Sequence, residues 1–411
     1  MAQNRNHRHH RAPRRERYVS PKTKIIIALS AIAVIAVAVL VMAFVNGWIA
    51  LPKLPERPQQ TTPPTQPKED TVIHLVAGGN VNITDKTVAS GGSDYDYSNV
   101  FLDVLPELSQ ADLTLLNFEG NVYGPPYGTQ HSSAPVQLLQ ALRASGVDIL
   151  QTANTESLTN GLLGLAATNQ AIRDAGMVPL GTYASNAEFE QYQGFVIYQI
   201  QGIRIALVAF TKGMDGRNLP SGSENCVNVL YEDYSSTYKS VNEEGITRVL
   251  KAVQAEKPDL TVAMLHWGGE NTDQVSASQK RICRLMADLG VNAIIGTHSH
   301  LVQGMGFYED TPMFVAYSLG DLVGDAEAIG THYSALLELT VTKDGKTGKT
   351  SITGWDYTPV YQQYDENGAL RLLRIRQAMA AYENDYIGKV SREVYDVLKS
   401  ALANIEKRVK G

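Results

Sequence analysis

Three histidines in the chain follow apolar segments and carry the imidazole groups that transition-metal ions favour. His266 comes directly after the apolar run 260–265, and His298 and His300 follow the run 291–295 in a Gly-Thr-His-Ser-His segment. Two imidazoles at positions i and i+2 of a loop can turn their nitrogens toward one ion. An isolated His-x-His pair is more often a pair of hydrogen-bonding loop residues. The third histidine, at the end of another apolar run, favours metal binding over that interpretation.

Polar side chains follow three further apolar segments. Glu119 comes shortly after the run 113–116, and its carboxylate would suit the oxygen that bridges two ions in a two-metal site. A helix cap or a loop salt bridge explains this glutamate equally well. Asn80 and Asn154 likewise come shortly after two other apolar runs. Because α/β sheets place ligand sites beyond the carboxyl ends of their strands, we expect these side chains to converge on one site.

The apolar runs that must position these residues alternate with amphipathic stretches of helical spacing. This alternation predicts an α/β domain with buried, partly parallel strands, which we place at residues 71–365. Residues 335–342 and 350–353 predict two strands joined by a polar turn. Residues 366–411 predict a C-terminal helical segment with a break at Gly388.

The first 49 residues predict a membrane anchor. Residues 1–24 hold eight Lys and Arg against one Glu and carry +7; because the whole chain carries −6, the remainder carries −13. The 21 residues of the apolar run 25–45 would span about 31 Å at about 1.5 Å per residue, enough to cross a bilayer. A cleavable signal peptide is the alternative, but its apolar region is normally shorter and ends at a small-residue cleavage site. We therefore expect a transmembrane signal-anchor helix at residues 25–49.

The charges on the two sides of this anchor predict its orientation. The basic residues are concentrated before it, so the positive-inside rule makes residues 1–24 a basic cytoplasmic tail. The chain is then a single-pass protein of the cell membrane, with its C-terminal domain extracellular. Residues 50–70 contain six prolines among threonines and glutamines and predict a stiff, extended linker.

The composition excludes several classes of protein. The acidic remainder of the chain makes nucleic acid an unsuitable partner. Cys226 and Cys283 are the only cysteines, so there is neither a disulfide framework nor zinc-finger spacing. The sequence leaves open whether these two cysteines pair. No Gly-x-Gly-x-x-Gly segment follows the first apolar run, which argues against a dinucleotide-binding loop.

Several segments taken together resemble those of a known family. They are Gly79-Asn80, Asn117-Phe-Glu119, Ala153-Asn154, His266-Trp-Gly-Gly-Glu270, Gly296-Thr-His-Ser-His300 and Tyr317-Ser-Leu-Gly-Asp321. Their order resembles that of the CapA/PgsA family of bacterial capsule and poly-γ-glutamate synthesis proteins, which is similar to the calcineurin-like metallophosphoesterases. The resemblance spans about residues 72–335 and implies a four-layer α/β/β/α sandwich around two sheets.

The resemblance also implies roles for individual residues. It implies that a divalent ion, such as zinc, manganese or iron, is bound by five side chains, namely Glu119, His266, His298, His300 and Asn80. It implies substrate contacts for a second set, namely Asn117, Trp267, Glu270 and Tyr317. It implies catalytic roles for Asn154 and Glu156.

Four positions depart from the family pattern. Asn80 stands where the family usually has Asp, Thr155 where it has a ligand Asn, and Asp321 where it usually has Asn. Glu156 replaces the histidine that stabilises or protonates the leaving group in phosphoesterases, and a carboxylate beside a phosphate adds repulsion. Three protein ligands and a water suffice for catalytic zinc, so the remaining residues can still hold one ion. A two-metal clamp is harder to reconcile with these changes.

We therefore expect a membrane-anchored protein of the CapA type that assists the synthesis or export of a capsule polymer. Its expected partners are poly-γ-glutamate or a related anionic polymer and membrane-bound polymer synthase subunits. Two alternatives remain: a non-catalytic scaffold of an envelope-polymer synthesis complex, and a metal-dependent phosphoesterase acting on an envelope substrate. The combined changes at Asn80, Thr155 and Glu156 slightly favour the scaffold.

Overall fold

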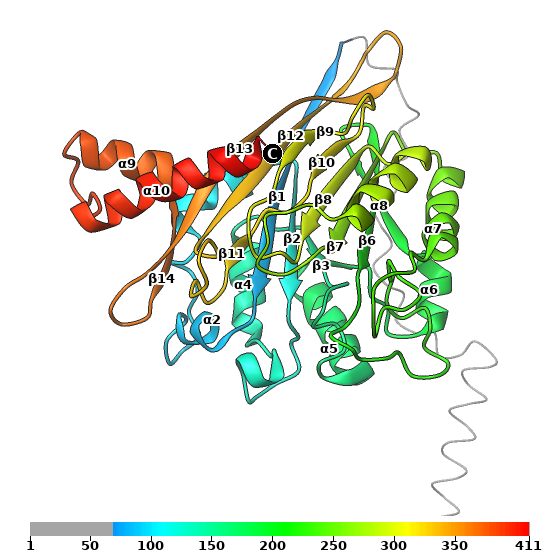
Figure 1. The fold of residues 1–411 in the computed structure, drawn as a ribbon, viewed down its shortest axis with the longest axis horizontal. Helices are drawn as coiled ribbons and strands as arrows, with labels where there is room; N and C mark the ends of the chain where they lie inside the picture. Colours follow the sequence, from blue (N-terminus) through cyan, green and yellow to red (C-terminus); the bar gives the residue numbers. More distant parts are fainter. Residues whose placement is uncertain (1–68, 411) are drawn as a thin grey trace, which may run out of the picture. The chain divides into compact units, whose positions relative to one another are not determined.

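Two β-sheets form the framework of residues 69–410, the part of the chain that the computed structural model describes (Figure 1). The first sheet has eight strands in the order β14-β13-β12-β1-β2-β3-β4, with β11 beside β1. Its strands are β1 (Thr71–Asn82), β2 (Leu113–Glu119), β3 (Ile149–Gln151), β4 (Val178–Leu180), β11 (Asp321–Val323), β12 (Tyr333–Lys343), β13 (Thr350–Tyr364) and β14 (Leu370–Arg374). The pairs from β1 to β4 and the pair of β1 with β11 are parallel, whereas β12, β13 and β14 join in antiparallel fashion.

The second sheet has six strands in the order β5-β6-β7-β8-β10-β9. Its strands are β5 (Phe195–Ile200), β6 (Ile203–Thr211), β7 (Leu260–His266), β8 (Ala293–Thr297), β9 (Met305–Phe307) and β10 (Phe314–Ala316). The four central strands are parallel, and β5 and β9 are antiparallel edges. Every residue of β7 and β8 is buried, as expected for continuous apolar runs in the middle of a parallel sheet.

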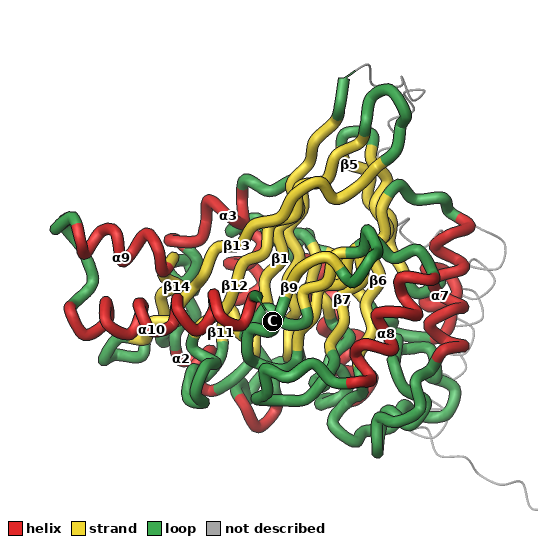
Figure 2. Tube along the Cα trace, turned by 45° about the horizontal axis from the view of Figure 1, so that its top comes forward, coloured by secondary structure: helices red, strands yellow, loops and turns green. Residues whose placement is uncertain are grey.

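Helices cover the outer faces of both sheets (Figure 2), whereas the last helix packs Leu398 and Ile405 into the core between the sheets. The α-helices are α2 (Asp85–Ala89), α3 (Leu105–Ser109), α4 (Val136–Ala144), α5 (Gly161–Asp174), α6 (Asn186–Tyr192), α7 (Glu243–Ala255), α8 (Ala277–Asp288), α9 (Ile375–Glu383) and α10 (Arg392–Val409). Two short 3-10 turns, Leu102–Val104 and Thr129–His131, lie in loops. Ser276 begins α8 with a capping box, in which its hydroxyl accepts from the backbone of Gln279.

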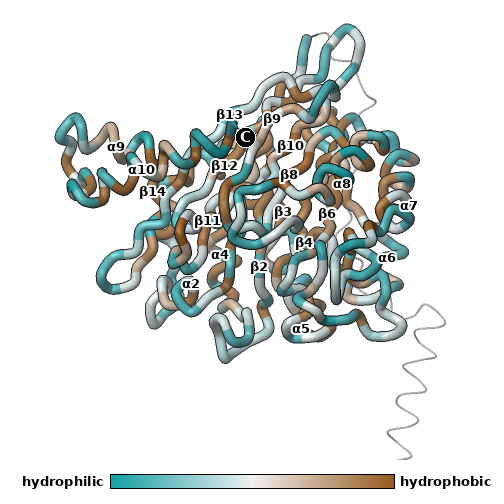
Figure 3. The backbone as a smooth tube through the Cα atoms, in the orientation of Figure 1, coloured by the Kyte–Doolittle hydropathy of each residue, from teal (hydrophilic) through white to brown (hydrophobic). Residues whose placement is uncertain are grey.

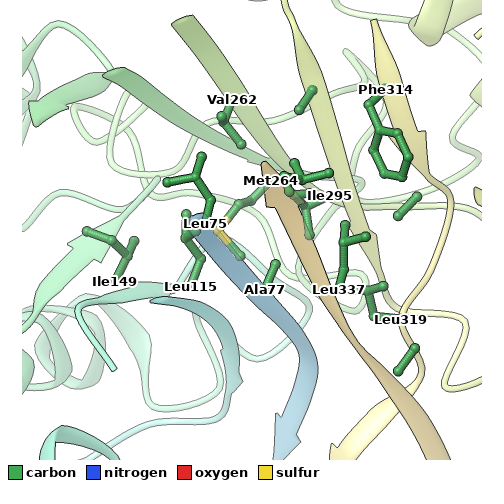
Figure 4. Packing of buried hydrophobic residues seen from close by; sticks show 14 of the residues in the cluster. Leu75, Ala77, Leu115, Ile149, Val262, Met264, Ile295, Phe314, Leu319 and Leu337 are labelled. Carbon is green, nitrogen blue, oxygen red and sulfur yellow. The ribbon is translucent and has the colours of Figure 1, made fainter. Parts of the chain in front are cut away.

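Three hydrophobic cores hold these layers together. One lies between the two sheets, where Leu75 of the first sheet and Val262 of the second belong to the same cluster (Figure 4). A second packs α4, through Leu139, against the outer face of the first sheet. A third packs α8, through Ile282, against the outer face of the second sheet. In Figure 3 the hydrophobic colour accordingly runs along strands in the interior. The mixed α/β fold with two sheets is confirmed.

The C-terminal region differs from the prediction at one point. The sequence predicts a helical segment at 366–411, with helices over 371–409, but residues 370–374 form strand β14, and α9 and α10 follow it. A Leu-Arg-Leu-Leu-Arg stretch suits either element, and pairing with β13 decides between them: Leu370 and Leu372 are buried, while Arg371 forms an ion pair with Asp103. Gly388 lies between α9 and α10 with a φ of 77°, at the predicted break.

Several predicted segments lie outside the described residues. These are the cytoplasmic tail 1–24, the transmembrane helix 25–49 and nearly all of the linker 50–70. Within residues 69–410, no helix has the length and apolar character needed to cross a membrane. Cys226 and Cys283 are both free and buried, so they do not form a disulfide with each other.

Candidate metal centre

Neighbouring strands of both sheets bring the candidate residues together at their carboxyl ends. The parallel register of β1 sets Asn80 opposite Asn117 of β2 on one side and opposite Asp321 of β11 on the other. In the second sheet, His266 is the last residue of β7, and His298 directly follows β8. The side chains that follow separate apolar runs in the sequence therefore meet at one place in the fold.

Glu119, His266 and His298 form a buried cluster that can hold a metal ion. Nε2 of His266 lies 3.2 Å from Oε1 of Glu119 and 3.0 Å from Nδ1 of His298. Ligand atoms bound at about 2.1 Å to one tetrahedral ion lie about 3.4 Å apart, so these separations fit a divalent ion. The other oxygen of Glu119, Oε2, is buried and has no hydrogen-bond partner among residues 69–410. Such an orphaned carboxylate oxygen is a further sign that the cluster suits a cation.

The charge states of these groups also suit a metal ion. Burial alone would raise the pKa of the Glu119 carboxyl, but the neighbouring His266 imidazole lowers it to about 2. Burial, followed by the nearby His266 and Lys212, holds the pKa of His298 well below its ordinary value. An ionised carboxylate and a neutral imidazole are the forms that bind metals.

Thr155 lies within this cluster although the sequence marks it as a lost ligand. Its hydroxyl donates to Oε1 of Glu119 at 2.9 Å, and the same oxygen lies 3.3 Å from Nε2 of His266. The Thr155 oxygen therefore faces the same atoms that would surround an ion. Its hydroxyl thus lies in the cluster at the position where the family resemblance implies a ligand amide.

His300 lies in a second cluster, with Asp321 and Asn80. Its Nδ1 lies 3.0 Å and 3.1 Å from the two carboxylate oxygens of Asp321, and 3.5 Å from Nδ2 of Asn80. Burial would lower the pKa of His300, but the Asp321 carboxylate outweighs it and raises the pKa to about 10. His300 is therefore a cation at neutral pH in the metal-free chain. Asp321 is a site residue that the sequence argument quoted without assigning it to the site.

A chain of buried amides joins the two clusters. Nδ2 of Asn117 donates to Oδ1 of Asn80 at 2.8 Å and lies 3.4 Å from Nδ1 of His266. Nδ2 of Asn154 donates to Oδ1 of Asn117 at 3.1 Å and to the carbonyl of Phe118 at 2.7 Å. Because these side chains are fully buried and bonded to one another, they orient the metal-binding residues.

The backbone of the site is strained at the histidines and crowded at a glycine. His298 and His300 have φ values of 92° and 58°, a region that non-glycine residues rarely adopt. A Cβ atom on Gly79 would lie 1.8 Å from the carbonyl oxygen of Gly320, so β1 can approach the segment before β11 only with glycine at this position.

A family model covers the strands that carry this site. The model of the bacterial capsule synthesis protein PGA_cap matches residues 74–326, which is more than half of the chain. The chain belongs to this family. The matched region runs from β1 to just beyond β11 and includes both clusters.

Two relatives share about a quarter of their residues with the chain over the aligned regions. The "Capsule biosynthesis protein CapA" of Bacillus anthracis is 25% identical over 294 residues, which cover 69% of this chain and 67% of the relative. The "PGA biosynthesis protein CapA" of Bacillus subtilis (strain 168) is 26% identical over 306 residues, which cover 72% and 74%.

Solved structures with a similar arrangement are more distant in sequence. A calcineurin-like phosphoesterase of Bacillus subtilis aligns with a TM-score of 0.43 and 14% identity, covering 77% of this chain and 98% of that one. A phosphatase of Mycoplasma pneumoniae aligns with a TM-score of 0.42 and 16% identity, covering 71% and 94%.

The structure gives the contacts of four residues whose roles the CapA/PgsA resemblance implies. The Glu156 carboxylate accepts a hydrogen bond from Thr159. Trp267 is completely buried, and its Nε1 donates to the carbonyl of Tyr317 at 2.9 Å while the two rings stack. Glu270 alone among the four is exposed, with its Oε1 3.9 Å from Nε2 of His298.

Lys212 is a residue of the site that the sequence argument did not identify. It directly follows β6, and its Nζ lies 3.2 Å from Nε2 of His298. One sequence signal could have found it: it follows the long apolar run 203–210, as the histidines and amides follow theirs. Lysine is not a metal ligand in the pattern of histidines and amides, so that pattern does not indicate it.

Proposed function

We propose that this member of the PGA_cap family is a membrane-anchored protein of capsule or poly-γ-glutamate synthesis and export, with a divalent ion in the centre described above. The observation that carries the proposal is the buried cluster of Glu119, His266 and His298, whose ligand atoms all lie within 4.8 Å of one another. The polymer role rests on the family, because capsule synthesis is what its model and its curated relatives describe.

A metal ion accounts for contacts that hydrogen bonds alone leave unsatisfied. Nε2 of His266 faces three acceptor or donor atoms, on Glu119, His298 and Thr155, all within 3.3 Å. One ring nitrogen has a single hydrogen or a single lone pair, so it cannot serve all of them. An ion held by these residues would satisfy their atoms together and would neutralise the Glu119 carboxylate, whose Oε2 has no hydrogen-bond partner among residues 69–410.

The ion would be zinc, manganese or iron, because a mixed set of imidazole and carboxylate ligands suits these metals. When bound, it would polarise a phosphoryl or amide group and lower the pKa of a water molecule. The chain's own residues would orient the reaction. Thr155 holds the Glu119 carboxylate, and Asp321 holds His300, so the two clusters keep fixed positions.

The membrane role rests on the sequence. The apolar run 25–45 would anchor the protein as a single pass, with the tail 1–24 in the cytoplasm and the folded domain outside the cell. Membrane-bound polymer synthase subunits would be its partners. Because the chain after the tail carries −13, an anionic polymer would need a local cationic group or a bridging cation.

A non-catalytic binding subunit is the second candidate, and one observation favours it. The Glu156 carboxylate is hydrogen-bonded to Thr159, and no ion pair or hydrogen bond links it to the cluster within the described part of the chain. The position that would hold the acid of a phosphoesterase therefore lacks a proton donor directed at the cluster.

The experiment that tests the proposal measures bound metal in the full chain purified in detergent. Elemental analysis should find about one equivalent or more per chain in the wild type. The double variant His266→Ala/His298→Ala should lose it, whereas His74→Ala, which changes a half-exposed histidine paired with Glu338, should keep it. A folded wild-type chain without metal would contradict the metal centre and leave the binding subunit. Surface polymer that is unchanged when the gene is deleted would contradict the polymer role.

A further inference from the structure

Lys212 lies beside the candidate metal centre and forms no ion pair among residues 69–410. It is the first residue after β6, and its Nζ donates to the carbonyl of Gly268 at 2.9 Å. The same atom lies 3.2 Å from Nε2 of His298 and 4.5 Å from the centre of the Tyr238 ring. Its ammonium group therefore contacts a residue of the metal cluster directly.

Contacts with the surrounding loops hold this lysine in place. The segment that carries Tyr238 packs directly on the residue after Lys212, because a Cβ on Gly213 would lie 2.0 Å from the carbonyl of Tyr234. This close approach places the aromatic ring over the ammonium group and excludes water from one side of it. The ammonium group is therefore held in a fixed place and partly shielded from water.

No carboxylate neutralises this cation among residues 69–410. Glu270 is the acid that acts on it through space, but the two groups form no ion pair within 4.0 Å, and the Glu270 side chain is mostly exposed. A partly desolvated ammonium without a counter-ion is unfavourable, and a cation beside a metal-binding cluster also opposes metal binding. Both penalties are removed when an anion lies against the lysine and the ion together.

The contact with His298 also indicates that Lys212 needs an anionic partner. Nδ1 of His298 faces His266 at 3.0 Å, so it is the nitrogen available to an ion. An imidazole that uses the Nδ1 lone pair in this way carries its hydrogen on Nε2. That N–H cannot accept a hydrogen bond from Lys212, so the ammonium needs another acceptor when the cluster is filled.

We propose that Lys212 is the anchor for an anionic group of the ligand, a phosphoryl or carboxylate group, which binds beside an ion held by Glu119, His266 and His298. This inference rests on the metal centre proposed above and adds the class of group that the centre receives. An ammonium group that is fixed next to a metal ion commonly stabilises negative charge on a bound ligand. It also supplies the local cationic group that an acidic domain needs in order to meet an anionic polymer.

The test uses the full chain in detergent, loaded with Mn²⁺, and measures the binding of two probes by isothermal titration calorimetry. Inorganic phosphate represents the phosphoryl group, and glutarate represents the carboxylate. The variants are Lys212→Met, Lys212→Arg and the control Lys86→Met, which changes an exposed lysine paired with Glu327. Metal per chain is measured in every sample, and circular dichroism checks that each variant is folded.

We expect Lys212→Met to weaken binding of at least one probe about tenfold or more. Lys212→Arg should retain much of the affinity, and Lys86→Met should match the wild type. The probe that binds the wild type more tightly identifies the anion. Binding of neither probe, or equal binding by the wild type and Lys212→Met, would overturn the proposal. Loss of metal from the wild type would instead contradict the metal centre, and a Lys212-dependent affinity in that sample would still support the anion site.

Discussion

The side-chain amide of Asn80 in β1 donates a 2.7 Å hydrogen bond to Oδ1 of Asp321 in β11, at positions paired in parallel register. Taken singly, the two residues are separate departures from the family pattern, an amide where Asp is usual and a carboxylate where Asn is usual. In the structure they face each other. The pair still contains one carboxylate and one amide, and His300 is bonded to the carboxylate.

This arrangement predicts that the two residues can be exchanged together. Asp321→Asn removes the carboxylate from the partly buried His300 and should cost about 2–4 kcal/mol of unfolding free energy. Asn80→Asp sets two carboxylates against each other and should cost about 1–3 kcal/mol. The double variant N80D/D321N restores one carboxylate and one amide, so most of both losses should be recovered. Urea denaturation of all four chains in the presence of a chelator gives the coupling energy, and simple additivity of the two losses would contradict the exchange.

The raised pKa of His300 predicts how stability changes with pH in the metal-free chain. Its pKa is about 10 when folded, against an ordinary value of 6.5 when unfolded, so the folded chain holds the proton more tightly. The stabilisation from this proton is therefore complete below about pH 6.5 and is lost as the pH rises through 10. Urea unfolding between pH 6 and 10 should show this decline in the wild type. If Asp321→Asn shows the same decline, the Asp321 carboxylate is not its cause.

Thr155 should contribute to metal retention through its hydroxyl. Thr155→Val keeps the shape of the side chain but removes the hydrogen bond to Glu119, and should weaken metal affinity by about tenfold or more. Thr155→Ser keeps the hydroxyl and should remain close to the wild type. Competition with a chelator of known affinity measures the change. Equal metal affinity in the valine and serine variants would show that the hydroxyl does not act on the centre.

Trp267 should affect stability far more than ligand binding. The side chain is fully buried and hydrogen-bonded to Tyr317, so Trp267→Ala should cost about 3–5 kcal/mol of unfolding free energy. Trp267→Phe, which keeps most of the packing, should cost less. Urea denaturation measures both losses, and calorimetry with phosphate or glutarate measures binding. A stable Trp267→Phe chain that no longer binds either probe would mean that this tryptophan contacts the ligand after all.

The sequence was sufficient to predict which strands carry the site, because local patterns determine where strands end. His266 follows a strand whose residues are all buried, and this pattern is visible in a run of consecutive apolar residues. The rule that parallel strands present ligands at their carboxyl ends then places such residues together. The two strands joined by the polar turn 344–349 were predicted for the same kind of reason.

The remaining features depend on contacts between distant parts of the chain. The pairing of Asn80 with Asp321 joins residues that are 241 positions apart, and nothing local to either residue indicates it. The sequence also does not indicate the direction in which a side chain points. Trp267 follows His266 of the candidate metal cluster, and the family resemblance implies a substrate contact for it, yet its ring turns into the core against Tyr317. The assignment of residues 370–374 depended on β13, which supplies the partner that makes this stretch a strand.

The close approach at Gly79 has a consequence for the order in which the centre can form. Gly79 and Asn80 belong to the first strand of the described chain, but they pack against Gly320 and Asp321, which lie just before and at the start of β11. The chain emerges from the ribosome N-terminus first. Strand β1 therefore lacks its neighbour β11 until almost four fifths of the chain has been made. If it crosses a membrane while unfolded, the pocket is completed only on the far side. An ion bound at this centre would then be captured from that compartment, and its identity would report on where the chain folded.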